Sequence, residues 1–419
     1  MRAVSILMAL GLLCVVTSPL RSDLPSWAWS WWLVAGVWAL GFGRRRGRFG
    51  VPAVAAPAVW CLVVACVIDA VMAMWHGDSW IILRQDGKVL LGLWVACVLM
   101  GTLPAPSSMG AGPTGVLNSA TQLREALCWA IGLQMVVAAA VAIEWPRAWL
   151  PATPIPWATA VALGMAVLAP LALGRPAGAP SGTAWRVGLG LAVLVGAVAV
   201  VLSRSRAAWV IFPWLGLLWV FMSPRKGRAL VAVLVAGLAA VGAGIWYDHL
   251  QPIQVERGLR LLDLLTELTQ WRDPDAGTSV GSRLLLWDAA WSSLWAHPWT
   301  GIGITERIAL VQQVVPPEQL REVAPLVHVH QQFLNQAVDH GLPGLLASLL
   351  CAAAPFALAW RALPGVMRWQ CLGVGVVHLT GLMFNANMTH GTYAVGYAVS
   401  LMAVMWMNAD ACREGASND

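Results

Sequence analysis

Histidines near the start of a long apolar stretch are the first residues whose type and spacing could do chemistry. His328 and His330 are separated by one residue. In an extended segment, side chains two residues apart point to the same side, so both imidazoles would face one site. The pair could hold a metal with Asp339 or His340 as a third ligand, could be structural, or could supply a general base near neutral pH. We favour the base, because no HExxH motif or cysteine partner accompanies the pair.

Arginines outside the expected helices offer a second kind of chemistry. Arg204 and Arg206 lie between two apolar stretches, where a cation needs water, lipid headgroups or an anion. Arg283 lies at the expected start of a helix, whose free amide groups also attract anions. Guanidinium groups pair with phosphate oxygens in a bidentate way, so these arginines could bind a substrate phosphate. The alternatives are contact with phospholipid headgroups for the first two and simple surface exposure for Arg283.

The chain that carries these residues is mostly hydrocarbon. Of its 419 residues, 59% are hydrophobic and only 11% are charged, whereas soluble domains have about 25% charged residues. Lipid must therefore cover part of the surface. The formal net charge of +6 comes largely from short basic connections, so we expect no nucleic-acid partner. The eight cysteines form no CxxC pattern and predict no disulfide framework.

Apolar stretches of about 20 residues are long enough to cross ~30 Å of hydrocarbon as helices. This length predicts an all-α integral membrane protein with about twelve spans. We expect the first stretch to be retained as a span and not removed as a signal peptide. The predicted spans are 3–20, 26–43, 51–75, 88–103, 124–144, 156–174, 186–202, 207–222, 229–246, 333–360, 366–384 and 393–409.

Basic residues in four connections fix the predicted orientation. All four connections fall on one side of the twelve spans, and the positive-inside rule places that side, with both termini, in the cytoplasm. Residues 1–246 then contain nine spans, and residues 247–332 form a long periplasmic loop that carries the site. Residues 333–419 contain three more spans and a cytoplasmic tail.

Two segments of the long loop have apolar residues at helical spacing. We expect residues 255–271 and 283–296 to form amphipathic helices at the membrane surface. The second places Trp287, Trp291 and Trp295 on one face, and tryptophan favours the level of the lipid headgroups. Packing of both helices against the bundle is the alternative.

Further polar residues are expected on the outward side. Arg84, Lys88 and Arg147 could add to an anion site or lie among lipid headgroups. His328 and Gln331 flank the candidate base and are expected to be accessory to it.

Three ordered motifs resemble the O-antigen ligase and polymerase family of bacterial inner-membrane proteins. They are SRSRAAW at 203–209, GSRLLLWDAAWSSLWAHPWTGIG at 281–303 and HVHQQFLNQAVDHGLPGLL at 328–346. The family pattern has an SR pair after a span, then GSR, and then a histidine motif with a downstream GxxG. Gln331 stands where the family commonly has asparagine.

The resemblance implies a helical fold of the GT-C class of membrane glycosyltransferases. The implied activity is that of an O-antigen ligase, which transfers polysaccharide from undecaprenyl diphosphate to a sugar hydroxyl of lipid A-core at the periplasmic face of the inner membrane. It implies no metal, nucleotide or other cofactor. Carried over by motif, His330 would be the catalytic base, and Arg206 and Arg283, with Arg204, would bind the diphosphate.

Other functions stay open on the sequence alone. A polymerase of the same family would join repeat units on the lipid carrier, and a protein O-oligosaccharyltransferase would use serine or threonine as the acceptor. A membrane transporter is a more remote alternative. Transporters place polar residues at mid-membrane, but here His378 is the main ionisable residue deep in a late span.

Overall fold

The computed structural model describes residues 2–21, 23–43, 51–78, 81–102, 120–145, 150, 153–174, 183–250, 274, 279–315, 327–362 and 364–408. Within these residues every regular element is a helix and no strand occurs, which confirms the predicted all-α class. The elements are α1 (Arg2–Thr17), η1 (Ser18–Leu20), α2 (Leu24–Gly43), α3 (Ala56–His76), α4 (Ile81–Thr102), α5 (Ala120–Glu144), α6 (Pro154–Leu173), α7 (Thr183–Leu202), η4 (Arg206–Val210), α8 (Ile211–Met222), α9 (Lys226–Leu250), α11 (Ser279–Ala296), α12 (Gly303–Val314), α13 (Gln332–Arg361), α14 (Val366–Phe384), η7 (Asn387–Thr389) and α15 (Gly391–Met407).

Each predicted span has a helical counterpart in this set. By length and composition, six helices of the described chain can cross a membrane, so the number twelve stays a prediction. Two details differ from the prediction. α4 begins at Ile81, so residues 81–87 are helical and not part of an outer loop. The stretch 207–222 is divided between the 3-10 turn η4 and α8.

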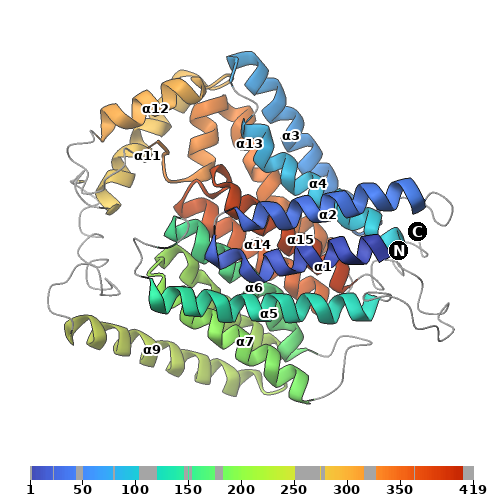
Figure 1. Cartoon of the computed structure of the whole chain (residues 1–419). Coiled ribbons are helices and arrows are strands. Elements are labelled where there is room, and N and C mark those ends of the chain that lie inside the picture. The colour runs from blue at the N-terminus through green and yellow to red at the C-terminus, as the bar shows by residue number, and fades with distance from the viewer. Residues whose placement is uncertain are drawn as a thin grey trace.

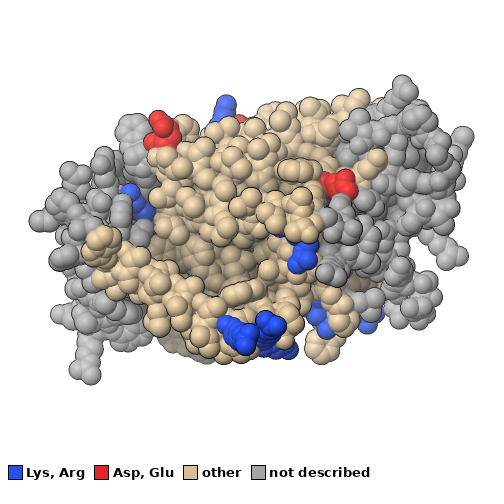
Figure 2. Space-filling model, turned by 90° about the horizontal axis from the view of Figure 1, so that it is seen from below, with Lys and Arg blue, Asp and Glu red and all other residues tan. Residues whose placement is uncertain are grey.

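The outer surface of the bundle is apolar over wide areas. α9 runs along the lower edge of the bundle in Figure 1, and its side chains Leu238 and Val231 are 74% and 61% exposed. Seen from below, the molecule presents a broad uncharged surface with only scattered charged groups (Figure 2). Burying this surface in hydrocarbon removes the unfavourable contact of apolar side chains with water. The surface supports a membrane-embedded protein.

The long helix α13 changes direction at Gly341, which divides it into two parts. Gly341 has φ 67° and ψ −153°, a conformation that only glycine adopts readily. Residues 342–361 form the longer part, about 30 Å if fully helical, which is enough for one span. Residues 332–340 lie before the bend, where α11 and α12 pack against α13 (upper left in Figure 1).

A small apolar cluster fixes α11 and α12 to this bent end. Leu286 and Ala290 of α11, Val311 of α12 and Val338 of α13 are fully or almost fully buried together. The predicted tryptophan-bearing helix at 283–296 is therefore confirmed as α11, which begins at Ser279. The other predicted helix, 255–271, lies outside the described residues.

Candidate active site

The segment that carries the two candidate histidines is anchored by the residue between them. Val329 is buried in the apolar cluster of α11, α12 and α13. Its amide donates to Asn335 Oδ1 at 3.3 Å, and its carbonyl accepts from Trp287 Nε1 at 3.1 Å. Both backbone groups are thus satisfied by side chains. This arrangement holds His328 and His330 at the start of α13.

An ion pair between α12 and α13 supports the same segment. Arg307 Nε and Asp339 Oδ1 are 2.5 Å apart, and both side chains are almost fully buried. Arg307 also donates to the carbonyl of Val327, at the beginning of the segment. Asn335 Nδ2 donates to Asp339 Oδ2 at 3.3 Å. The two carboxylate oxygens of Asp339 therefore hold an arginine and an asparagine.

Gln331, expected to be accessory to the chemistry, caps a helix. Its Oε1 accepts from the amide of Leu334 at 2.6 Å and satisfies one free donor of the first turn of α13. The next residue, Gln332, accepts from the Met388 amide at 3.0 Å and joins α13 to the connection between α14 and α15. That connection, residues 385–390, also contacts both candidate histidines.

His330 has a defined hydrogen-bond partner in this connection. Its Nδ1 lies 3.1 Å from Asn385 Oδ1, while Asn385 Nδ2 donates to Asn387 Oδ1 at 2.9 Å. Since the Asn385 nitrogen is used by Asn387, its oxygen is the atom that accepts from His330. The proton of a neutral His330 imidazole then lies on Nδ1, and Nε2 keeps its lone pair. The arrangement provides a proton acceptor at Nε2.

Burial and nearby charge keep this imidazole neutral. Burial, followed by repulsion from the Arg283 guanidinium, lowers the pKa of His330 to about 4. The bond to Asn385 acts in the opposite direction, and His390 adds to the lowering. The structure therefore brings Arg283 of α11 within electrostatic range of His330. The helix begins at Ser279, so Arg283 is its fifth residue, and the expectation that Arg283 lies at the start of the helix is wrong.

His328 faces the same connection as His330. Its Nε2 lies 3.4 Å from Thr389 Oγ1, and its ring packs edge-on against His390 with ring centres 5.7 Å apart. Burial is the main cause that lowers the pKa of His328 to about 3, and repulsion from Arg307 adds to it. Both imidazoles thus contact residues 385–390, as the spacing predicts.

Arg204 and Arg206 lie at the end of α7, in a turn fixed by two buried serines. Ser203 Oγ donates to the Val200 carbonyl at 2.7 Å and accepts from the Ser205 amide at 3.2 Å. Arg204 has a positive φ of 54°. Such a conformation is unusual for a residue with a side chain, and it is typical of functional sites.

The packing of α8 along α14 places this turn towards the end of α14 that precedes Asn385. The ring of Trp369, near the start of α14, packs against Phe221 at the end of α8, and Trp214 lies against Gly373 further along α14. The two helices are therefore antiparallel. η4, which begins with Arg206 and contacts α14, lies towards the end of α14 that continues into Asn385.

The remaining predicted cations are less closely tied to the site. α4 contacts η7, and Lys88 contributes its carbonyl, which accepts from Trp29 Nε1 at 3.0 Å. Arg84 lies in α4, and nothing is assigned to its side chain. Arg147 lies outside the described residues. These three stay predictions.

A second polar cluster lies where α3 meets the bend of α13. His340 Nδ1 is 3.7 Å from Asp69 Oδ1, and its Nε2 is 3.8 Å from Asp78 Oδ2. His76 stacks on His340 with ring centres 6.0 Å apart and donates from Nε2 to the Thr300 carbonyl at 2.6 Å. His340 therefore joins α3 to α13. Among the residues that the structure describes, no three His, Cys, Asp or Glu side chains are arranged to hold a metal ion.

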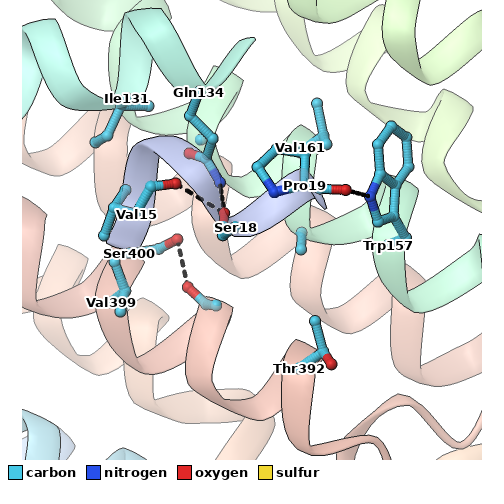
Figure 3. Close-up of a pocket in the computed structure, with 13 residues that line it drawn as sticks. Val15, Ser18, Pro19, Ile131, Gln134, Trp157, Val161, Thr392, Val399 and Ser400 are labelled. Carbon is cyan, nitrogen blue, oxygen red and sulfur yellow. Dashed lines mark hydrogen bonds between the residues drawn. The ribbon is translucent and has the colours of Figure 1, made fainter. Parts of the chain in front are cut away.

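A small pocket of about 50 Å³ lies among η1, α5, α6 and α15 (Figure 3). Most of its lining is apolar, and Gln134 Nε2 donates across it to Ser18 Oγ at 2.9 Å. None of the predicted site residues lines it. The cavity is a packing feature of the bundle, whereas the candidate site lies between α11, α13 and the connection after α14.

Sequence analysis missed the part of the site contributed by residues 385–390. Asn385, Asn387, Thr389 and His390 hold the two histidines, but they carry none of the recognised motifs. One signal was available, since the run NANMTH is a dense polar stretch between two apolar helices. Its pairing with His330 could not be read from sequence, because 55 residues separate His330 and Asn385.

Comparison with known proteins agrees with the motifs. Residues 191–349 match the family model described as O-Antigen ligase. The match covers less than half of the chain and includes Arg204, Arg206, Arg283 and His330, but not residues 385–390. No curated protein matches the chain. The resemblance deduced from the three motifs is confirmed.

Proposed function

Because residues 191–349 belong to the O-antigen ligase family, we propose that this chain ligates polysaccharide to lipid A-core. The donor is polysaccharide on undecaprenyl diphosphate, and the acceptor is a sugar hydroxyl of lipid A-core. The observation that carries the proposal is the hydrogen bond from His330 Nδ1 to Asn385 Oδ1, 3.1 Å long. This bond leaves His330 Nε2 free to accept a proton. His330 lies within electrostatic range of Arg283, and both residues lie inside the matched range 191–349.

The reaction is a single displacement. The acceptor hydroxyl gives its proton to His330 Nε2 while its oxygen bonds to the anomeric carbon of the donor sugar. The bond between that carbon and the diphosphate oxygen breaks, and its electron pair leaves with undecaprenyl diphosphate. The anomeric centre is inverted. The Nδ1 proton of the imidazolium stays in the hydrogen bond to Asn385 Oδ1. The Nε2 proton then passes to water.

Arginines stabilise the leaving group. Negative charge develops on the diphosphate as the glycosidic bond breaks, and fixed guanidinium groups are suited to hold it. Arg283 lies within electrostatic range of His330, and Arg206 and Arg204 lie towards the same end of α14. The donor carries its own leaving group, so the reaction needs no nucleotide, metal or other cofactor.

The position of the basic residues supports a site that faces the periplasm. α7 and α14 each have an arginine near their first residue, and each leads at its last residue into a segment of the candidate site. Arg186 donates to the Ala172 and Leu173 carbonyls, and Arg368 donates to the Ala362 carbonyl. By the positive-inside rule the arginine-bearing ends lie in the cytoplasm of a bacterial inner membrane. The opposite ends, with His330, then face the periplasm.

Reconstitution tests the proposal. Purified chain is mixed with undecaprenyl-diphosphate-linked polysaccharide and lipid A-core in the presence of EDTA, and the products are separated on a gel. A ladder of polysaccharide on lipid A-core is the expected result. Longer chains on the lipid carrier would instead identify a polymerase. Absence of both products would overturn transfer between these substrates.

A further inference from the structure

The hydrogen bond of His330 continues into the membrane-embedded core. Asn385 Nδ2 donates to Asn387 Oδ1 at 2.9 Å, and Asn387 is completely buried. The Asn387 side-chain amide and the Tyr393 hydroxyl both lie against Gly381, and the two side chains interact. By strict geometric criteria, Asn387 Nδ2 is a buried donor without a hydrogen-bond partner among the described residues. Because buried donors are normally satisfied, we infer that this nitrogen donates to the tyrosine oxygen.

The chain of polar groups ends on a histidine in α14. Tyr393 Oη lies 2.8 Å from His378 Nδ1, and both residues are completely buried. Residues 378, 381 and 385 lie along one face of α14, so the polar chain follows this helix for about 10 Å. Gly381 leaves room for it, because a Cβ atom there would lie 2.7 Å from Asn387 Nδ2.

Each member of the chain can point in only two directions. When Tyr393 donates to His378, Asn387 donates to Tyr393, Asn385 donates to Asn387, and Asn385 Oδ1 accepts from His330 Nδ1. If every member is reversed, Asn385 Nδ2 donates to His330 Nδ1. The proton of neutral His330 is then on Nε2, which cannot act as a base. The direction of the chain therefore corresponds to the tautomer of His330.

We propose that Tyr393 and His378 are positioning residues that hold His330 in the tautomer with a basic Nε2, acting through Asn387 and Asn385. The effect of this positioning on the rate of transfer rests on the proposed function. Its effect on the tautomer of His330 does not. His378 is thereby explained as the buried end of a polar chain. A proton path through the membrane is not needed to account for it.

The matched variants are Tyr393→Phe and Tyr397→Phe. Tyr397 stacks on His378 with ring centres 3.6 Å apart, but its hydroxyl donates to the Cys351 carbonyl at 3.1 Å, outside the chain. Each variant thus removes one buried hydroxyl next to His378, and only the first breaks the chain. Gly381→Ala is a third variant, which displaces Asn387 and removes no hydrogen-bonding group.

Two readouts test the proposal on the purified full-length chain. In ¹⁵N-histidine NMR, His330 should carry its proton on Nδ1 in the wild type and in Tyr397→Phe, and should show both tautomers in Tyr393→Phe and Gly381→Ala. In the ligation assay, Tyr393→Phe should lower kcat about 10-fold with an unchanged KM, as expected when a group that orients a functional histidine is lost.

An unchanged His330 spectrum in Tyr393→Phe and Gly381→Ala would overturn the proposal. Equal kcat values for Tyr393→Phe and Tyr397→Phe would do the same. If the wild type transfers no sugar at all, the proposed function fails, and the NMR spectra still decide whether the chain sets the tautomer.

Discussion

Arg307 in α12 and Asp339 in α13 form a buried ion pair that also holds the segment before His330. The 2.5 Å contact between Arg307 Nε and Asp339 Oδ1 is extended by the bond from Arg307 to the Val327 carbonyl. Both side chains of the pair are almost fully buried, so the pair supports the segment from within the protein. It connects the packing of α12 on α13 with the geometry of the site.

Removing one partner of this pair should destabilise the protein. Asp339→Ala leaves the Arg307 charge buried and unpaired, which typically costs about 3–5 kcal/mol. Unfolding of the purified chain in denaturant measures the change. The double variant Arg307→Met/Asp339→Leu should recover part of the loss, because no unpaired charge remains. A loss in the double variant equal to the sum of the losses in Arg307→Met and Asp339→Leu would show that the two residues do not interact.

The pH dependence of transfer should follow the low pKa of His330. A general base works only when unprotonated, and the pKa of His330 is lowered to about 4. We therefore expect kcat/KM, which reports the pKa of the free enzyme, to stay level from neutral pH down to about pH 5 and to fall as pH approaches 4. Measurement of kcat/KM for the acceptor across this pH range gives the profile. A fall centred near pH 6.5, the value for a free histidine, would contradict the environment described here.

Replacing Arg283 should move that profile. The Arg283 guanidinium repels a proton on His330 and lowers its pKa. In Arg283→Gln this repulsion is absent, so the fall in kcat/KM should occur at a higher pH than in the wild type. Arg225→Gln is the control, because Arg225 lies in the connection between α8 and α9. The whole of α8 separates this connection from η4. A profile that is identical in all three proteins would remove Arg283 from the neighbourhood of His330.

Binding of the donor diphosphate should depend on Arg206. A hydrogen bond to a charged group contributes about 1.5–3 kcal/mol, so Arg206→Gln should raise the KM for the lipid-diphosphate donor about 10- to 100-fold. The KM for lipid A-core should change little. Arg206→Lys should recover part of the loss, since lysine keeps the charge but not the bidentate geometry. Equal changes in both KM values would indicate a general disturbance of the fold.

Much of the fold could be predicted because hydrocarbon imposes a simple rule. A helix must be long and apolar to cross a membrane, and the described helices lie where the apolar stretches predicted them. The rule says little about how far a helix extends into the polar residues beside the apolar stretch. For this reason the start of α4 was predicted at residue 88, whereas the helix begins at Ile81. The bend at Gly341 follows from a different signal, since the glycines and proline at 341–344 are typical of a turn.

The candidate site was only partly predictable, for a different reason. Arg204, Arg206, Arg283, His328 and His330 belong to recognisable local motifs, and each carries chemistry by its own side chain. Asn385 and Tyr393 act through contacts across distant segments of the chain. Asparagine and tyrosine between two apolar helices have many ordinary roles, and only the packing of α13 against the end of α14 shows which partner they hold.

The backbone gives one further link between motif and geometry. Within the described residues, Arg204 and His330 are the two residues other than glycine with a positive φ, 54° and 57°. Sequence patterns do not predict this conformation for arginine or histidine. Strained backbone that persists at two candidate site residues is consistent with a site whose surroundings hold it in place.

The most direct test of the account is the transfer rate of His330→Ala, measured with undecaprenyl-diphosphate-linked polysaccharide and lipid A-core. His297→Ala is the control, because His297 is exposed at the end of α11. We expect His330→Ala to lose transfer by about 10²- to 10⁴-fold, the usual effect of a general base, and His297→Ala to retain it. A folded His330→Ala protein that transfers polysaccharide at the wild-type rate would contradict the account.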